Sequence, residues 1–324
     1  MKQAPFEASR GPEWDAFERF LDARGKSEGA LPVFPPAEMP QRYRRLCQSL
    51  ALAADRRYSP DLVDRLNQLS LRGHRELYAN RGRQTQRAAD FLLVAFPSLV
   101  RREWRLVAAA ALLFFGPLLV LIAVLQYAPE FVYYILGPRE IANFHEMYDP
   151  ANHRLGMREA DTSLAMFGVY IWNNIRIGFQ TFAGGILAGV GSVWFLAANG
   201  VIIGSVAGYL TQVGYAGTFW PFVAGHSSLE LTAIVLSGAA GLRLGLAVIS
   251  PGNVSRKAAL VAAARPAVRM MYGAAVMFAL AAFVEAFWSP LSEIPFEAKI
   301  GLGVAGWLAV LGYLGLAGRS RGAG

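Results

Sequence analysis

Residues 106–125, LVAAAALLFFGPLLVLIAVL, decide the fold, because these 20 residues include no charged side chain. An α-helix of this length rises about 30 Å, which is the thickness of the hydrocarbon core of a bilayer. Arg101, Arg102 and Arg105 precede the stretch, and basic residues of this kind are typical of the cytoplasmic flank of a membrane helix. The stretch therefore predicts a transmembrane helix.

The whole chain of 324 residues has the composition of a membrane protein. Apolar residues make up 54% and charged residues 17%, against about 25% charged residues in a typical soluble domain. Residues 1–105 hold 19 of the 31 Lys+Arg and 13 of the 23 Asp+Glu. The net charge of +8 would also suit a nucleic-acid-binding protein, but we recognise no such motif and expect no nucleic-acid partner.

We predict an all-α fold, a polytopic membrane helical bundle of about six spans preceded by a small cytoplasmic helical domain. The basic cytoplasmic domain is assigned to residues 1–105 and the transmembrane domain to residues 106–324. A tight turn at Asn199-Gly200 is expected between the second and third spans. The spans are predicted at residues 106–125, 176–196, 200–214, 229–249, 270–288 and 300–317.

The distribution of Lys and Arg predicts the orientation. The N-terminal domain, residues 250–269 and the C-terminal tail are basic, whereas residues 126–166 and 289–299 are poor in Lys and Arg. We therefore expect a multi-pass membrane protein with the N- and C-termini in the cytoplasm. The span at 200–214 is short. If it were re-entrant, residues 250–269 would move outside and break the charge rule.

Small residues recur every four positions in three predicted spans. Such spacing forms a groove on a helix in which another backbone can approach closely. The pattern predicts helix packing within the chain, and it also allows an oligomer face or a lipid-facing groove. The candidate helix-packing residues are Gly185, Gly189, Gly200, Gly204, Gly208, Gly241 and Gly245.

Polar residues within apolar spans are costly and therefore informative. His226 and Glu230 are four residues apart and would share a face of a continuous helix. Three interpretations stay open: a buried functional pair, a metal site, and a capping box in which Ser227 is the N-cap. Zinc usually needs three or four protein ligands, and the spacing indicates no others, so we predict no metal. The candidate buried polar cluster is Asn173, Asn174, Arg176, Asn199, His226, Glu230 and Glu285.

No motif of an enzyme is recognisable. The chain has no Walker motif, no dinucleotide fingerprint, no His-Glu-x-x-His and no hydrolase nucleophile signature. The single cysteine, Cys47, is interpreted as a small core residue. We therefore predict no catalytic residues, no cofactor and no enzymatic activity.

Two sets of short motifs give the chain a family resemblance from about residue 13 to 318. The N-terminal set is YRRLC at 43–47, LALA at 50–53, YSP at 58–60, LN at 66–67, RGH at 72–74 and LY at 77–78. The membrane set is NNIR at 173–176, GGI at 184–186, NG at 199–200, HSSLE at 226–230 and GAAGL at 238–242. The chain resembles the stage II sporulation protein M family, in its broader, non-sporulating bacterial branch.

The resemblance implies an interaction protein of the bacterial cytoplasmic (inner) membrane. The namesake of the family works in a membrane complex with a peptidoglycan hydrolase during engulfment. Members of the broader branch are often associated with an AAA-type ATPase and a von Willebrand-type protein, which implies that the cytoplasmic domain docks proteins. One position departs from the family pattern: Gly often follows the His, whereas Ser227 follows His226 here.

Two functions follow from these observations. The first is a non-enzymatic membrane scaffold, an interaction subunit of a bacterial envelope or membrane-remodelling complex, whose partners are the lipid bilayer, other proteins and, as one alternative, further copies of this chain. The second is a transporter or channel for a small solute or ion that uses the buried His/Glu/Arg/Asn cluster. Clustering of these residues around a solvated cavity would favour transport, and dispersal to separate helix ends would favour the scaffold.

Overall fold

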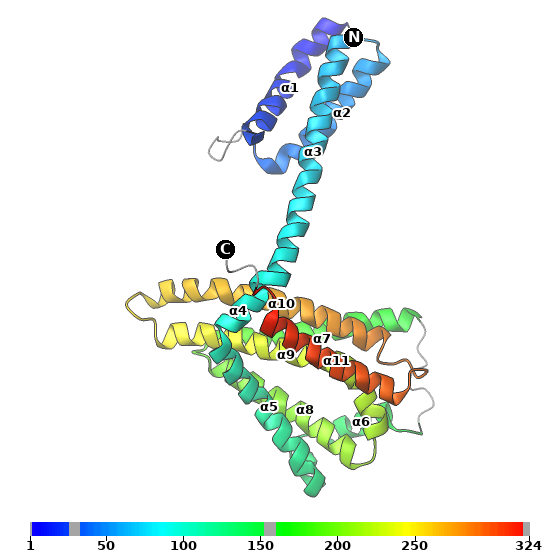
Figure 1. The fold of residues 1–324 in the computed structure, drawn as a ribbon, viewed down its shortest axis with the longest axis vertical. Coiled ribbons are helices and arrows are strands. Elements are labelled where there is room, and N and C mark those ends of the chain that lie inside the picture. Colours follow the sequence, from blue (N-terminus) through cyan, green and yellow to red (C-terminus); the bar gives the residue numbers. More distant parts are fainter. Residues whose placement is uncertain (1, 26–32, 152–159, 320–324) are drawn as a thin grey trace. The chain divides into compact units, whose positions relative to one another are not determined.

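The computed structural model describes residues 2–25, 33–151 and 160–319, and these residues form helices and no strand. The predicted all-α fold is therefore confirmed. The chain divides into two units, Met1–Asp90 and Phe91–Gly324, each shown in Figure 1. The division lies earlier than the boundary after residue 105 that hydropathy indicated. The reason is packing: residues after Asp90, such as Phe96, belong to the core of the second unit.

The first unit is built from α1 (Gln3–Gly25), the short 3-10 helix η1 (Pro36–Glu38), α2 (Met39–Asp55) and α3 (Pro60–Asp90). Its core is rich in aromatic side chains, among which Phe20 stacks on Phe34 with ring centroids 4.2 Å apart. Ion pairs join α1 to α3 at the surface: Arg65 contacts Asp15 at 2.7 Å and Glu18 at 2.8 Å. The unit therefore has a core of its own.

The second unit begins with a π-helix, η2 (Phe91–Ala95), and contains eight α-helices in its described part. The α-helices are α4 (Phe96–Arg102), α5 (Trp104–Tyr127), α6 (Pro138–Tyr148), α7 (Ala160–Ala183), α8 (Val190–Gln212), α9 (Ala216–Ile249), α10 (Arg256–Phe287) and α11 (Phe296–Leu316). Two 3-10 helices, η3 (Pro129–Tyr134) and η4 (Gly184–Ile186), lie in the connections.

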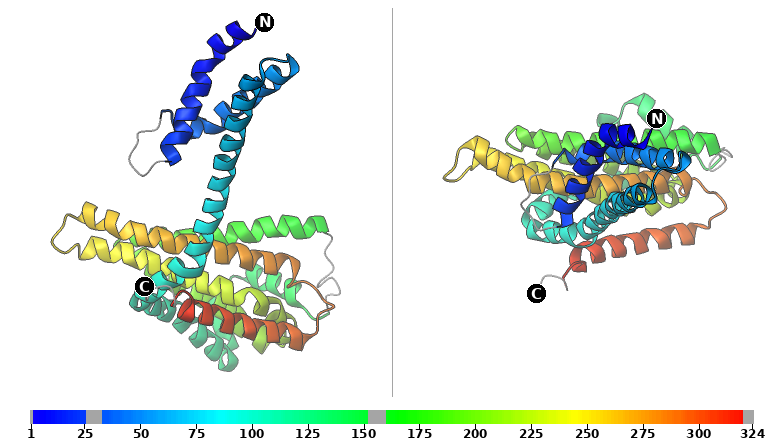
Figure 2. Two further views of the ribbon diagram at one scale, coloured as in Figure 1. Left: turned by 45° about the horizontal axis from the view of Figure 1, so that its top comes forward. Right: turned by 90° about the horizontal axis from the view of Figure 1, so that it is seen from above.

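Helix α9 is the centre of the second unit. It packs against α5, α7, α8, α10 and α11, and Figure 1 and the left view of Figure 2 show α10 running alongside it. In the most apolar 18-residue stretch of α9, 67% of the residues are buried. The corresponding stretches of α5 and α11 are each 17% buried. Exposed Leu112, Leu119 and Leu308 lie on these outer helices. A sequence whose outer helices expose large apolar side chains needs hydrocarbon around it.

The contacts between helices show that the chain runs back and forth through this unit. Gly200 lies against Phe114 and Gly208 against Ile122, so α8 is parallel to α5. The short connections from α8 to α9 and from α9 to α10 reverse the chain. Contacts between α7 and α10 show that these two helices are antiparallel, and contacts between α11 and α9 show that these two are parallel. Helices α7, α9 and α11 therefore run in one direction, and α5, α8 and α10 in the other.

Five described helices are long and apolar enough to cross a membrane: α5, α8, α9, α10 and α11. Helix α7 is equally long, with 24 residues, but its sequence is more polar, with Asn173, Asn174 and Arg176 in its second half. Because α7 runs antiparallel to α10 within the same bundle, it completes a set of six long helices, of which five meet the length and composition of a span.

The prediction of the second and third spans is wrong in its boundaries. The break between them lies at residues 184–189, not at Asn199-Gly200, because α8 is continuous from Val190 to Gln212. Gly189 supplies the left-handed backbone, with φ of 81°, that begins α8, a conformation that glycine adopts without strain. Asn199-Gly200, which the sequence suggested as a turn, therefore lies in the interior of α8.

The last three predicted spans are present but begin too late. Helix α9 begins at Ala216 rather than 229, α10 at Arg256 rather than 270, and α11 at Phe296 rather than 300. The four basic residues of the predicted 250–269 loop therefore all lie in the first half of α10, and the loop itself is short. A prediction based on the length of an apolar run misses the charged part of a helix that continues past that run.

Candidate functional site

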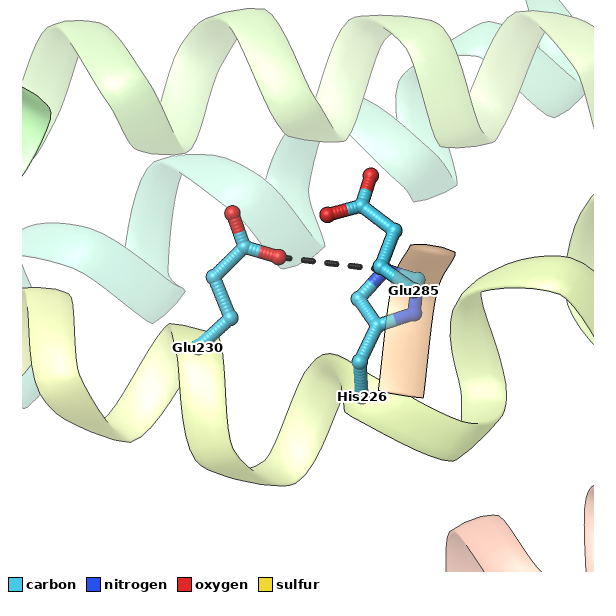
Figure 3. Close-up of side chains that lie close together, drawn as sticks. All are labelled: His226, Glu230 and Glu285. Atoms are coloured by element: carbon cyan, nitrogen blue, oxygen red, sulfur yellow. Dashed lines mark ion pairs between the residues drawn. The ribbon is translucent and has the colours of Figure 1, made fainter. Parts of the chain in front are cut away.

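His226, Glu230 and Glu285 converge within the membrane unit. His226 and Glu230 come from α9 and Glu285 comes from α10, and one ligand atom of each lies within 4.8 Å of the others. Figure 3 shows the imidazole and the two carboxylates facing one shared space, and its dashed line marks the contact of 3.8 Å between His226 Nε2 and Glu230 Oε2. We call these three residues the His–Glu–Glu cluster.

The continuity of α9 places two members of the cluster on one face. Its N-cap residue is Tyr215, so Ser227 and Glu230 both lie in the helix interior. The capping interpretation is therefore wrong: Ser227 Oγ donates to Ala224 O at 3.2 Å, and Glu230 faces His226 instead of a free amide. Residues four apart on an α-helix are neighbours on its surface, which is the geometry that the cluster needs.

Burial makes the cluster energetically expensive unless its members are paired. The side chain of His226 is 5% exposed and that of Glu230 is 18% exposed, and Glu285 is partly buried. Charged side chains in an apolar surrounding are normally paired or bound to a metal. The cluster therefore marks a point where a proton or a cation can be held.

A second layer of contacts fixes the imidazole. His226 Nδ1 is 3.1 Å from Ser289 Oγ, and Ser289 is 1% exposed. The backbone carbonyl of Ser289 accepts a hydrogen bond of 2.8 Å from Lys299 Nζ on α11. These contacts join α9, the 288–295 connection and α11 around the cluster, and they leave Nε2 of His226 directed at Glu230.

Aromatic rings and a glycine pack beside the cluster. The ring of Phe222 meets His226 edge to face, with centroids 5.9 Å apart. Trp288 lies so close to Gly225 that an added Cβ would contact its ring. Lys299 Nζ is 5.9 Å from the centroid of the same indole. Rigid neighbours of this kind restrict the rotamers of the side chains that they touch.

The cluster lies far along α9 from the basic end of the unit. Arg243, also on α9, is 17 residues from His226, which corresponds to about 26 Å along a helix axis. Arg101, Arg102 and Arg105 lie at the Arg243 end, because Glu103 between them pairs with Arg243. The cluster is therefore near the opposite end of a hydrocarbon core about 30 Å thick.

The other predicted polar residues do not join the cluster in any described contact. Asn174 is 2% exposed, and its Nδ2 has no hydrogen-bond partner within the described ranges. Asn173 donates to Asn174 at 3.4 Å, and Arg176 on the same helix is exposed. Asn199 donates to Phe195 O at 2.7 Å, within α8. The seven candidates thus separate into one cluster and two local groups.

The candidate helix-packing glycines all lie against backbone of another segment of the chain. An added Cβ on Gly185 would contact Gly241, and one on Gly245 would contact Gly189, so α9 meets the α7–α8 connection. Gly200, Gly204 and Gly208 of α8 lie against the backbone of α5. Close approach of this kind is how small residues pack membrane helices.

Sequence reasoning missed two residues that support the cluster, Ser289 and Lys299, and one that pairs with the partly buried Arg243. Ser289 and Lys299 lie outside or at the edge of the predicted spans, and nothing in their spacing links them to His226. Arg243 is a charge within an apolar helix, but its partner Glu103 lies 140 residues away in sequence. The signal available for Lys299 was its position directly before the apolar stretch at residues 300–317.

Comparison with known proteins gives a family for most of the membrane unit. The family model described as stage II sporulation protein M matches residues 109–290. A second model, a domain of unknown function (DUF8413), matches residues 4–79, within the first unit. No curated protein and no solved structure matches the chain. The stage II sporulation protein M match confirms the resemblance for the membrane set of motifs, and it covers α8, α9 and α10. The N-terminal set of motifs lies outside it, within the residues that the second model matches. The chain therefore belongs to the stage II sporulation protein M family.

Proposed function

We propose that this protein is a non-enzymatic scaffold of the bacterial cytoplasmic membrane, an interaction subunit of an envelope or membrane-remodelling complex. The observation that supports this most strongly is the division of the chain into two units of different character. The second unit is anchored among lipids by long helices, and the first is a separate helical unit with its own core. A protein built in this way holds a docking module at a membrane surface.

The surface of the first unit supports docking. Leu71 on α3 is 53% exposed and Leu52 on α2 is 39% exposed, while Arg44 and Arg75 are exposed on the same two helices. Leucine and arginine on adjacent helices can supply the apolar centre and the charged rim of an interface. The protein partners proposed by family resemblance, an AAA-type ATPase and a von Willebrand-type protein, are candidates for this surface.

We infer that the first unit and the C-terminus lie in the cytoplasm. Arginines before α5, Arg256 and Lys257 at the start of α10, and Arg319 after α11 lie at chain positions that the alternating helix directions bring to one side. Basic residues accumulate on the cytoplasmic side of bacterial membrane proteins. With six passes, every basic segment is on that side.

Site-specific photo-crosslinking in living membranes tests the scaffold. A photoreactive amino acid at Leu71 is expected to form an adduct with another protein, whereas the same amino acid at Leu308, 69% exposed on α11, is expected to react with lipid. The protein extracted in a mild detergent should migrate as a complex. Recovery of a lone monomer, with no protein adduct at Leu71, would contradict the proposal.

A transporter or channel is the second candidate, and the convergence of His226, Glu230 and Glu285 favours it. Buried ionisable residues in membrane bundles often belong to proton or ion pathways. If the cluster carries flux, Glu230→Gln should abolish flux of the transported ion in liposomes while the protein still folds. Flux equal to that of the wild type would exclude Glu230 from such a pathway.

A further inference from the structure

We propose that His226, Glu230 and Glu285 bind one divalent transition-metal cation of the zinc class inside the membrane unit. The sequence alone offers two of the ligands on one helix, and the third comes from α10, some 55 residues further along. This goes beyond a scaffold function, because it assigns a chemical ligand to a site within the bundle.

The spacing of the ligand atoms suits a cation of this size. Zinc binds imidazole nitrogen and carboxylate oxygen at about 2.0–2.2 Å, which puts neighbouring ligands of a tetrahedral site roughly 3.5 Å apart. His226 Nε2 and Glu230 Oε2 are 3.8 Å apart, and all three ligand atoms lie within 4.8 Å of one another. Small rotations of the two glutamate side chains would complete the coordination.

The donor set favours a transition metal over calcium or magnesium. One imidazole nitrogen and two carboxylates combine a ligand preferred by zinc and iron with two oxygen donors. Calcium requires six to eight oxygen ligands and magnesium usually retains several waters. A divalent cation would also neutralise two carboxylates that lie close together in an apolar surrounding, where like charges repel strongly.

The surroundings of His226 match those of a metal-bound histidine. A ligating imidazole normally donates its other N–H to a fixed acceptor, which sets the tautomer. When Nδ1–H of His226 donates to Ser289 Oγ at 3.1 Å, the lone pair of Nε2 faces the two glutamates. Ser289 is itself held through the hydrogen bond from Lys299 to its carbonyl.

Three protein ligands leave a fourth position of a tetrahedral site open to water or another exchangeable ligand. Because the ligands come from both α9 and α10, the cation would also link these helices near the end of the unit opposite Arg243. The first measurable consequence is structural: the loaded protein should resist unfolding more than the metal-free protein.

Metal analysis of the purified full-length protein tests the site directly. The protein, with any affinity tag removed, is treated with EDTA in detergent, incubated with zinc chloride, desalted and assayed for metal content. We expect one zinc per chain in the wild type. His226→Ala, Glu230→Gln and Glu285→Gln should each weaken zinc binding at least about 100-fold, and Ser289→Ala about 10-fold, as for other outer-shell partners.

His145→Gln is the matched control. His145 lies in the same unit, with its ring nitrogens 2.8 Å from Tyr209 Oη and 3.2 Å from Tyr215 Oη, and it belongs to no described group of metal-ligating side chains. This variant should bind zinc as the wild type does. Zinc should raise the thermal unfolding midpoint of the wild type and of His145→Gln, and leave the midpoint of the three cluster variants unchanged.

Each result decides the proposal. It is overturned if the wild type binds no stoichiometric zinc, if a folded cluster variant binds zinc as tightly as the wild type, or if magnesium or calcium competes at equal concentration. If a cluster variant fails to fold, the thermal unfolding midpoint of the wild type is compared with and without zinc instead. A midpoint that zinc leaves unchanged counts against the site. Failure here leaves the crosslinking test of the scaffold unaffected.

Discussion

Arg243 of α9 donates a hydrogen bond to the carboxylate of Glu103, the residue between α4 and α5. Glu103 is 9% exposed, and the pair ties the central helix of the membrane unit to the segment that begins its first long helix. Arg101, two residues earlier, donates to Leu314 O at 2.8 Å near the end of α11. Contacts distant in sequence thus fasten three helices at one end of the bundle.

Loss of the Glu103 carboxylate should destabilise the membrane unit. Breaking a buried ion pair from one side typically costs about 3–5 kcal/mol, and the partial exposure of Arg243 reduces the expected cost of Glu103→Gln to about 2 kcal/mol. The measurement is the midpoint of denaturation of the detergent-solubilised protein by dodecyl sulfate.

The double variant Glu103→Gln/Arg243→Met supplies the control for this pair. Because it removes both charges, it should lose less stability than the sum of the two single variants, with a coupling of about 1 kcal/mol or more. Additive losses would show that the two residues act independently, contrary to the contact.

Close backbone packing at Gly241 should be intolerant of a single methyl group. An added Cβ would lie 2.9 Å from the carbonyl oxygens of both Thr181 and Phe182. Forcing such contacts costs about 1–3 kcal/mol, so Gly241→Ala should lower the unfolding midpoint. Gly312→Ala is the matched control, since no atom lies within 4 Å of its added Cβ, and an equal loss in both variants would contradict the packing argument.

Length and composition predicted the membrane helices because a long uncharged run such as 106–125 has few stable structures other than a membrane-spanning helix. The same reasoning misplaced the break between α7 and α8. Asn199-Gly200 has the composition of a turn, yet Asn199 bonds within its own helix and Gly200 packs against Phe114. Glycine in a membrane helix can serve close packing, and the sequence alone does not separate this use from a turn.

The candidate site was predicted only in part, for a related reason. His226 and Glu230 could be linked by helical spacing, because four residues make one turn of α9. Glu285 was flagged as a buried charge, but its position beside the pair depends on how α10 packs against α9. Ser227 and Glu230 match the sequence pattern of a capping box. The helix does not begin there, because α9 packs within the bundle and is continuous through both residues.

Phe20 should control the stability of the first unit without affecting the second. It is 1% exposed and stacks on Phe34, and replacing a buried phenylalanine by alanine typically costs about 3–5 kcal/mol. In Phe20→Ala, limited trypsin digestion should cut the first unit faster while the membrane unit stays intact. Leu71→Ala, at a residue 53% exposed, should digest like the wild type. Faster cleavage of both units would contradict their independence.

Cysteine labelling should establish how often the chain crosses the membrane. Once Cys47 is replaced by serine, single cysteines at Gln48, Asn253 and Glu293 report on the first unit, the α9–α10 connection and the α10–α11 connection. All three positions are exposed. We expect a membrane-impermeant maleimide to label intact spheroplasts at Glu293 alone, and at Gln48 and Asn253 only after lysis.

The labelling pattern depends on α7, the most polar of the six long helices. If α7 crosses, the chain has passed four times by residue 253, and the basic start of α10 returns to the side of the first unit. If α7 lies along the surface, only three crossings precede residue 253, and Asn253 must lie opposite Gln48. Labelling of Asn253 in intact spheroplasts, with Gln48 protected, would therefore overturn the six-pass arrangement and leave α7 at the interface.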